Sequence, residues 1–207
     1  MTNKRHVRRL LAAACAAAGA LACLPALPAV DLGEVRLEES TQVAGQNLQL
    51  NGAGIARRLV FKVYAMGLYL PDRAHHTDAV LASAGPRRMT ILPLRDISGD
   101  DFSEAVMSDL SSERFASAEL RGQLLALANT IVQRPGGLRR GDVLTLDWVP
   151  GVGAVVALNR KPLAAPMRNR AVYDALLMVW LGEKPTDPAL KAKLLGGAAA
   201  DLREARL

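Results

Sequence analysis

The chain has 207 residues, of which 50% are hydrophobic and 22% are charged. This composition is typical of a globular protein and excludes a chain that is disordered over most of its length. The formal charge of +6 points to an anionic partner only at first sight, because four of the 26 basic residues lie within residues 1–29, which contain no acid. The remaining 22 basic and 20 acidic residues nearly balance, and with three Tyr, three Phe and two Trp there is no support for nucleic-acid binding.

Residues 1–29 have the pattern of a secretory signal peptide. A basic start is followed by an apolar stretch at 10–27 and by small residues with proline before Val30. The pattern predicts cleavage after Ala29 and export to the periplasm. The apolar stretch is rich in Ala and no basic stop-transfer cluster follows it, so we expect no stable membrane insertion after cleavage.

Both cysteines, Cys15 and Cys23, lie in this predicted signal. Cleavage would leave a chain without a disulfide, a thiolate metal site or a cysteine nucleophile. One alternative stays open, since Ala22-Cys23 is similar to a lipoprotein cleavage site that would anchor the chain through an acylated Cys23. Ala20 stands where such sites usually have leucine.

The first half of the remaining chain predicts mainly strands. Segments 35–38 and 48–51 alternate apolar and polar residues, as half-buried strands do. Gly52 and Gly54 interrupt this alternation before a stronger strand at 59–70, which Pro71 ends. A short helix is expected from Thr77 to Ser83, and a further strand at 87–94.

The second half predicts helices around one hairpin. Apolar residues four apart indicate a helix that opens at 98–100 and a second that begins at Ser117 and stops before Pro135. A hairpin follows, with strands at 143–148 and 154–158. Two helices are expected after the hairpin. The first ends at Gly182, and the second begins at Asp187 with a proline in its first turn.

These elements favour an α+β fold. Strands precede, separate and follow the helices without the regular strand-helix alternation of a parallel sheet. We therefore predict a large antiparallel β-sheet with helices packed on one face. Residues 30–44 are expected to form a polar lead-in, and residues 45–207 a single domain.

Most patterns that could carry chemistry have simpler explanations. The Gly52-Ala53-Gly54 segment lacks the third glycine and the following helix of a nucleotide-binding loop, so a turn or bulge is favoured. The adjacent His75 and His76 lack the spacing that places two metal ligands on one face of a helix. Carboxylates at 100, 101 and 104 suit the first turn of a helix, where the helix dipole stabilises negative charge. We predict no metal and no cofactor.

Polar side chains within apolar strands leave two readings open. Lys62, Tyr64 and Tyr69 lie on the strand expected at 59–70, which Arg57 and Arg58 precede. Alternation places Lys62 and Tyr64 on one face and Tyr69 on the other, if no bulge intervenes. The set suits a ligand pocket with a cation at its mouth, and equally suits ordinary core and rim positions.

Several segments in order resemble the chalcone isomerase-like proteins, most closely the exported bacterial branch. The resemblance covers about residues 45–197 and rests on 51–55 (Asn-Gly-Ala-Gly-Ile), 61–70 (Phe-Lys-Val-Tyr-Ala-Met-Gly-Leu-Tyr-Leu), 91–94, 141–142, 150–153, 175–182 and 194–196. It implies an open-faced β-sandwich, which agrees with the fold class above. Plant members of the family close a flavanone ring by attack of a phenolate, whereas relatives bind fatty acids without isomerising them.

The positions that carry catalysis in the enzymes differ here. The resemblance places Ala56 where the enzymes have an anion-stabilising arginine, with Arg57 and Arg58 displaced by one and two residues. Catalytic Thr, Tyr and Asn positions correspond to Tyr64, Phe102 and Asp109. Loss of even one oxyanion donor typically lowers a rate about a hundredfold or more. Chalcone isomerisation is therefore not expected.

The sequence thus predicts an exported, non-catalytic protein that binds a small apolar or amphipathic ligand between sheet and helices. Its expected ligand-binding residues are Arg57, Arg58, Tyr64, Phe102 and Asp109. Two alternatives remain, an isomerase or lyase acting on a phenolic or enone substrate and a module that binds another envelope protein. The sequence does not fix the oligomeric state.

Overall fold

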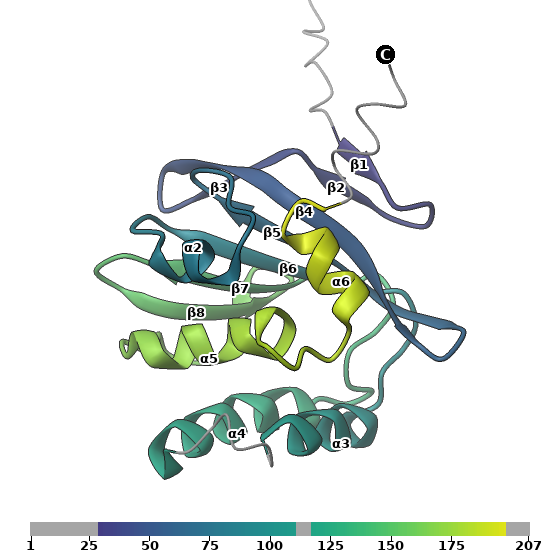
Figure 1. Cartoon of the computed structure of the whole chain (residues 1–207). Coiled ribbons are helices and arrows are strands. Elements are labelled where there is room, and N and C mark those ends of the chain that lie inside the picture. Colours follow the sequence, from purple (N-terminus) through teal and green to yellow (C-terminus); the bar gives the residue numbers. More distant parts are fainter. Residues whose placement is uncertain (1–28, 111–116, 198–207) are drawn as a thin grey trace, which may run out of the picture.

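The computed structural model describes residues 29–110 and 117–197, with side chains for all of these except 105–110. Its centre is a curled antiparallel sheet in which seven strands follow one another in chain order (Figure 1). The strands are β3 (Ser40–Val43), β4 (Gln46–Arg58), β5 (Phe61–Leu70), β6 (Arg87–Pro93), β7 (Leu144–Val149), β8 (Gly153–Leu158) and β9 (Lys161–Pro162). The predicted α+β class is confirmed.

Helices cover one face of this sheet (Figure 1). They are α2 (Thr77–Ala82), α3 (Gly99–Leu110), α4 (Ala118–Val132), α5 (Arg170–Leu181) and α6 (Pro188–Leu194). As predicted, α4 and α6 begin at the N-cap residues Ser117 and Asp187. The side chains of these two residues accept the Leu120 and Leu190 N–H groups, respectively. Among the described residues, no helix is long and apolar enough to cross a membrane.

A smaller sheet covers part of the opposite face. It consists of β1 (Ala29–Asp31) and β2 (Arg36–Glu38), which lie in and just before the predicted polar lead-in. Its Leu37 packs in a second apolar cluster with Leu48, Leu50 and Tyr69 from the main sheet. The lead-in therefore takes part in the packed structure.

The turn or bulge predicted for the Gly52-Ala53-Gly54 segment is a bulge that lies directly before Gly52, at Asn51, and the glycines do not end the strand. The register shifts between Leu50 and Gly52, and β4 continues through both Gly52 and Gly54 to Arg58. The glycines allow α6 to approach the strand. A Cβ atom on Gly52 would lie 2.0 Å from the Lys193 carbonyl oxygen, which no real structure tolerates.

Asn51 fixes the same contact by hydrogen bonds. Its buried side-chain amide donates to the carbonyl oxygens of Ala74 (2.9 Å) and Leu194 (2.8 Å) and accepts the Ala74 N–H (2.8 Å). One side chain thus joins β4 to the segment before α2 and to the end of α6. Buried polar groups satisfied in this way hold a single arrangement of the surrounding backbone.

The raised pKa of Tyr69 predicts how the free energy of unfolding changes at alkaline pH. Its side chain is buried against β2, donates to the Glu38 carbonyl oxygen (3.0 Å), and has a pKa raised to about 12, chiefly by burial. Below pH 10 the tyrosine is protonated in both folded and unfolded chains, so stability does not change with its ionisation. Between pH 10 and 12 only the unfolded chain ionises. In urea unfolding, Tyr69 should therefore contribute a loss of about 1.4 kcal/mol per pH unit in this window, in addition to the loss from Tyr173, whose pKa is also raised by burial.

The Tyr69→Phe variant is the control for this pH profile. It should unfold with a flatter profile above pH 10, because the phenol at position 69 is removed while Tyr64 and Tyr173 remain. A slope equal to that of the unchanged protein would contradict the assignment to Tyr69.

Candidate functional site

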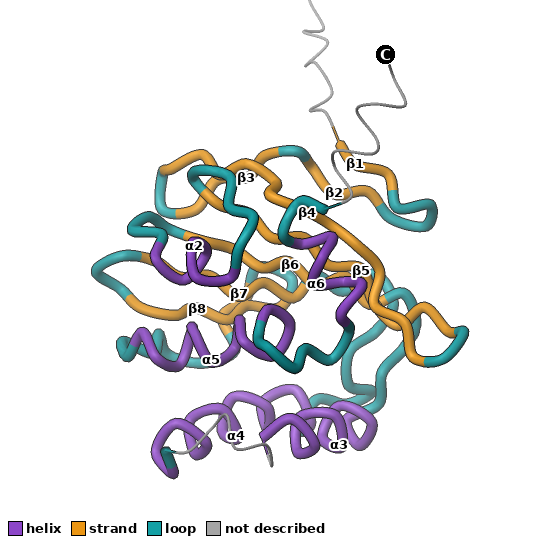
Figure 2. Tube along the Cα trace, viewed as in Figure 1, coloured by secondary structure: helices purple, strands orange, loops and turns teal. Residues whose placement is uncertain are grey.

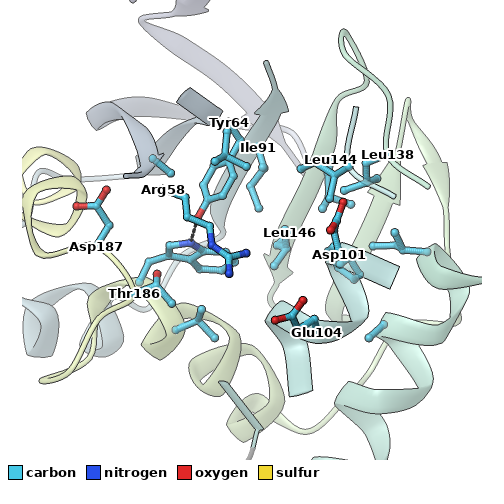
Figure 3. A pocket seen from close by; sticks show the side chains of 18 of the residues that line it. Arg58, Tyr64, Ile91, Asp101, Glu104, Leu138, Leu144, Leu146, Thr186 and Asp187 are labelled. Carbon is cyan, nitrogen blue, oxygen red and sulfur yellow. Dashed lines mark hydrogen bonds between the residues drawn. The ribbon is translucent and has the colours of Figure 1, made fainter. Parts of the chain in front are cut away.

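A cavity of about 730 Å³ lies between the main sheet and the helices α3, α4 and α5 (Figure 3). Its walls are mostly aliphatic side chains from both layers, including Ile91, Leu144 and Leu146 of the sheet and Leu124, Leu127 and Ile131 of α4. The volume falls within the range of small-molecule sites, which are typically lined by apolar side chains with few polar groups. The cavity is therefore suited to an apolar or amphipathic molecule.

One polar residue on the sheet side of the cavity is Tyr64 of β5. Its phenolic oxygen accepts a hydrogen bond of 2.8 Å from the indole Nε1–H of Trp180 on α5 (Figure 3). Both residues line the cavity and are partly buried. The bond joins sheet to helix and fixes the orientation of both rings.

Charged residues gather at the mouth. Arg57 and Arg58 at the end of β4 and Arg95 after β6 line the cavity together with the acids Asp101, Glu104 and Asp187. Asp187 caps α6 and accepts the Arg57 N–H (3.4 Å), and Asp101 is bonded to Ser98. Figure 3 shows the exposed Arg58 side chain extending over the cavity toward Tyr64. Within the described residues, its guanidinium has no hydrogen bond or ion pair.

The structure brings together four of the five residues expected to bind a ligand. Arg57, Arg58, Tyr64 and Phe102 all line this cavity. The fifth, Asp109, belongs to α3, but its side chain lies outside the described part of the chain. The catalytic position that the resemblance assigned to arginine, Ala56, also lies on the wall.

A register shift explains why Lys62 and Tyr64 do not share a face. Ala56 pairs with Tyr64 and Arg57 with Lys62, so Val63 is an extra residue on β5. Such a bulge reverses the alternation of side chains. Lys62 instead bonds Glu34 (3.0 Å), while Val63 and Tyr64 both face the cavity. Tyr69 lies on the opposite face from Tyr64, as predicted.

The other sequence candidates do not converge on a reactive centre. His75 contacts the Leu195 carbonyl oxygen (3.1 Å) and, with His76, lines a depression of about 370 Å³ near α5 and α6. Among described residues, no group of three or more His, Cys, Asp or Glu side chains is placed to hold a metal ion. The site is therefore defined by the apolar cavity and its charged mouth.

Sequence reasoning missed Trp180 as a site residue. Trp180 lies in the helix predicted to end at Gly182, and nothing in the neighbouring sequence links it to its partner Tyr64, which is 116 residues away. Arg95 and Asp187 were missed for the same reason, since no local pattern places them beside Arg58. A signal that could have indicated Trp180 is its polar N–H group on an otherwise apolar helix face, which needs an acceptor when buried.

Comparisons with known proteins agree with this architecture. A family model described as chalcone isomerase-like matches residues 29–196. A search of curated proteins finds no match. Among solved structures, a fatty-acid binding protein of Arabidopsis thaliana superposes with a TM-score of 0.60 and 16% identity, covering 84% of this chain and 98% of that one. At that identity the likeness shows a shared fold.

Proposed function

The chain belongs to the chalcone isomerase-like family, and we propose that it binds a fatty-acid-like ligand in the cavity between sheet and helices without catalysing a reaction. The observation that carries this proposal is the aliphatic cavity of about 730 Å³ with arginines at its mouth. Burial of an acyl chain releases about 0.8 kcal/mol for each methylene group. The structural neighbour described as a fatty-acid binding protein supports the same class of ligand.

The charges suggest which way the ligand lies. The deep wall is formed by aliphatic side chains such as Leu146 and Ile131, which suit an acyl tail. Arg58 is exposed at the mouth, where its guanidinium can pair with a carboxylate in a bidentate geometry. We therefore place the tail inside and the carboxylate at Arg58.

The residues at the catalytic positions support binding without catalysis. Ala56 cannot stabilise an anion, and Phe102 cannot donate a hydrogen bond. Both line the cavity, so the ligand would meet a methyl group and a phenyl ring where the enzymes of this family offer polar groups. We expect the absorbance of a chalcone solution to remain unchanged when the protein is added.

The proposed location is the periplasm. Its support is the basic and apolar pattern of residues 1–29, which lie outside the described residues apart from Ala29. An exported, nearly neutral domain with an acyl-binding cavity would carry its ligand through the aqueous space of the envelope. Detection of the processed chain in a periplasmic extract would test this location.

Titration with palmitic acid and with hexadecanol tests the function. After removal of co-purified lipid, the protein should bind both compounds. Arg58→Gln should weaken palmitate binding about five- to tenfold, because it removes a solvent-exposed hydrogen bond between the guanidinium and the carboxylate. Hexadecanol binding should be unchanged, since the alcohol carries no charge. Isothermal titration calorimetry measures both affinities.

Arg73→Gln is the matched control, because Arg73 is exposed and lies outside the cavity lining. An equal effect of the Arg58 and Arg73 variants would contradict the carboxylate site. Failure of the unchanged protein to bind either compound would contradict the function itself.

A further inference from the structure

The turn between β4 and β5 exposes three consecutive apolar residues. Leu59, Val60 and Phe61 are 90%, 79% and 60% exposed, and no other run of described residues exposes neighbouring large apolar side chains in this way. Figures 1 and 2 show this hairpin extending beyond the body of the molecule. Leu59 also has a φ of 56°, a conformation that disfavours leucine. Apolar residues gathered at an exposed point mark a contact with another surface.

The charges of the hairpin indicate which surface. No acid occurs between Glu39 and Asp72, so the charged residues of this hairpin are Arg57, Arg58 and Lys62, and all three flank the apolar tip. Glu34 pairs with Lys62, so the two arginines are the remaining charged side chains of the hairpin itself. Cations beside exposed apolar side chains complement a bilayer that contains anionic lipids.

The tip is also part of the cavity mouth. Arg57, Arg58, Leu59 and Phe61 line the cavity, whereas Val60 does not. The carboxylates at the mouth come from other segments, Asp101 and Glu104 from α3 and Asp187 from the start of α6. A surface in contact with the hairpin would therefore lie directly beside the opening through which an apolar ligand must pass.

We propose that the β4–β5 tip inserts reversibly into the surface of an anionic bilayer, with Leu59, Val60 and Phe61 among the acyl chains and the arginines at the headgroups. A protein partner fits less well, since a stable protein interface buries about 800 Å² on each side and this apolar surface is one hairpin turn. The contact goes beyond ligand binding and does not require it. Together with the proposed function, it gives the ligand a path between bilayer and cavity.

Flotation with vesicles tests the contact on the full chain. Binding should increase when phosphatidylglycerol is mixed into phosphatidylcholine, and Val60→Asp should lower it about tenfold or more by placing a charge at the apolar tip. Because Val60 does not line the cavity, palmitate affinity in solution should stay unchanged. This separates failure of the membrane contact from failure of ligand binding.

Val152→Asp is the matched control. Val152 is 44% exposed in the turn between β7 and β8, at the opposite end of the strands from Val60. All three proteins share residues 1–28, so any contribution of that segment is the same in each. Equal vesicle binding of the two Asp variants would count against the tip.

A second measurement reports on the tip directly. Tryptophan fluorescence of Val60→Trp should be quenched by vesicles of brominated phosphatidylglycerol beyond the quenching of the native tryptophans, whereas Val152→Trp should show no added quenching. Equal quenching of the two variants, or no quenching of either, would overturn the proposal. The same results are expected if the tip binds a protein instead of a bilayer.

Discussion

Replacement of Gly52 by alanine is expected to lower the free energy of unfolding by about 3 kcal/mol. The added Cβ atom would lie 2.0 Å from the Lys193 carbonyl oxygen and 2.6 Å from that of Leu194. Both atoms belong to backbone at the end of α6, so no side-chain rotation can relieve the overlap. The helix must move off β4, and the Asn51 hydrogen bond to Leu194 would be lost with it.

Chemical unfolding followed by circular dichroism measures this effect. Gly122→Ala is the matched control, because Gly122 is exposed in α4 and a Cβ atom there meets nothing within 4 Å. That substitution should stabilise the protein by up to about 1 kcal/mol through helix propensity. If Gly52→Ala were as stable as the unchanged protein, α6 would not pack on β4 as described.

Filling the cavity is expected to abolish most ligand binding. Ala128 is buried on α4 and lines the cavity, so Ala128→Trp would place an indole in the space proposed for the acyl tail. Displacing about four methylenes from the apolar wall would weaken binding about a hundredfold. Palmitate and hexadecanol should be affected alike, in contrast to Arg58→Gln, because the tail is common to both.

The control for the filled cavity lies on the same helix. Ala126 is exposed on α4, so Ala126→Trp adds the same ring at a position outside the cavity lining. Unfolding curves of both variants establish that the helix remains folded. Undiminished palmitate affinity in a folded Ala128→Trp protein would show that the ligand binds elsewhere.

Local signals were enough to predict most elements of the fold. The caps at Ser117 and Asp187 act within one helical turn, so the residues that begin α4 and α6 are recognisable in the sequence itself. Period-two alternation likewise depends on neighbouring residues. The class of fold followed from the order of these elements.

Contacts between distant segments account for what was missed. Gly52 interrupts an alternating pattern, yet the strand continues through it. The glycine is there because α6, about 140 residues later, packs on a position without a side chain. The extra residue Val63 reversed the face expected for Lys62. Neither the helix that packs on a glycine nor the register of a bulge is encoded in neighbouring residues alone.

The candidate site shows the same division. The family resemblance selected Tyr64 and Phe102, and the structure places both on the cavity wall. It could not select Trp180, whose bond to Tyr64 arises only when α5 packs on the sheet. Several residues that line the cavity were therefore predictable, whereas the hydrogen bonds between them required the tertiary structure.

The contact between Asn51 and Leu194 also has a consequence for the order of folding. These residues are 143 positions apart, and the intervening chain forms most of the main sheet and the helices α2 to α5. The cost of closing so long a loop is met only when those elements have compacted the chain. We therefore expect α6 to dock last, and a nascent chain emerging in sequence order to leave the glycine surface of β4 uncovered until its final helix arrives.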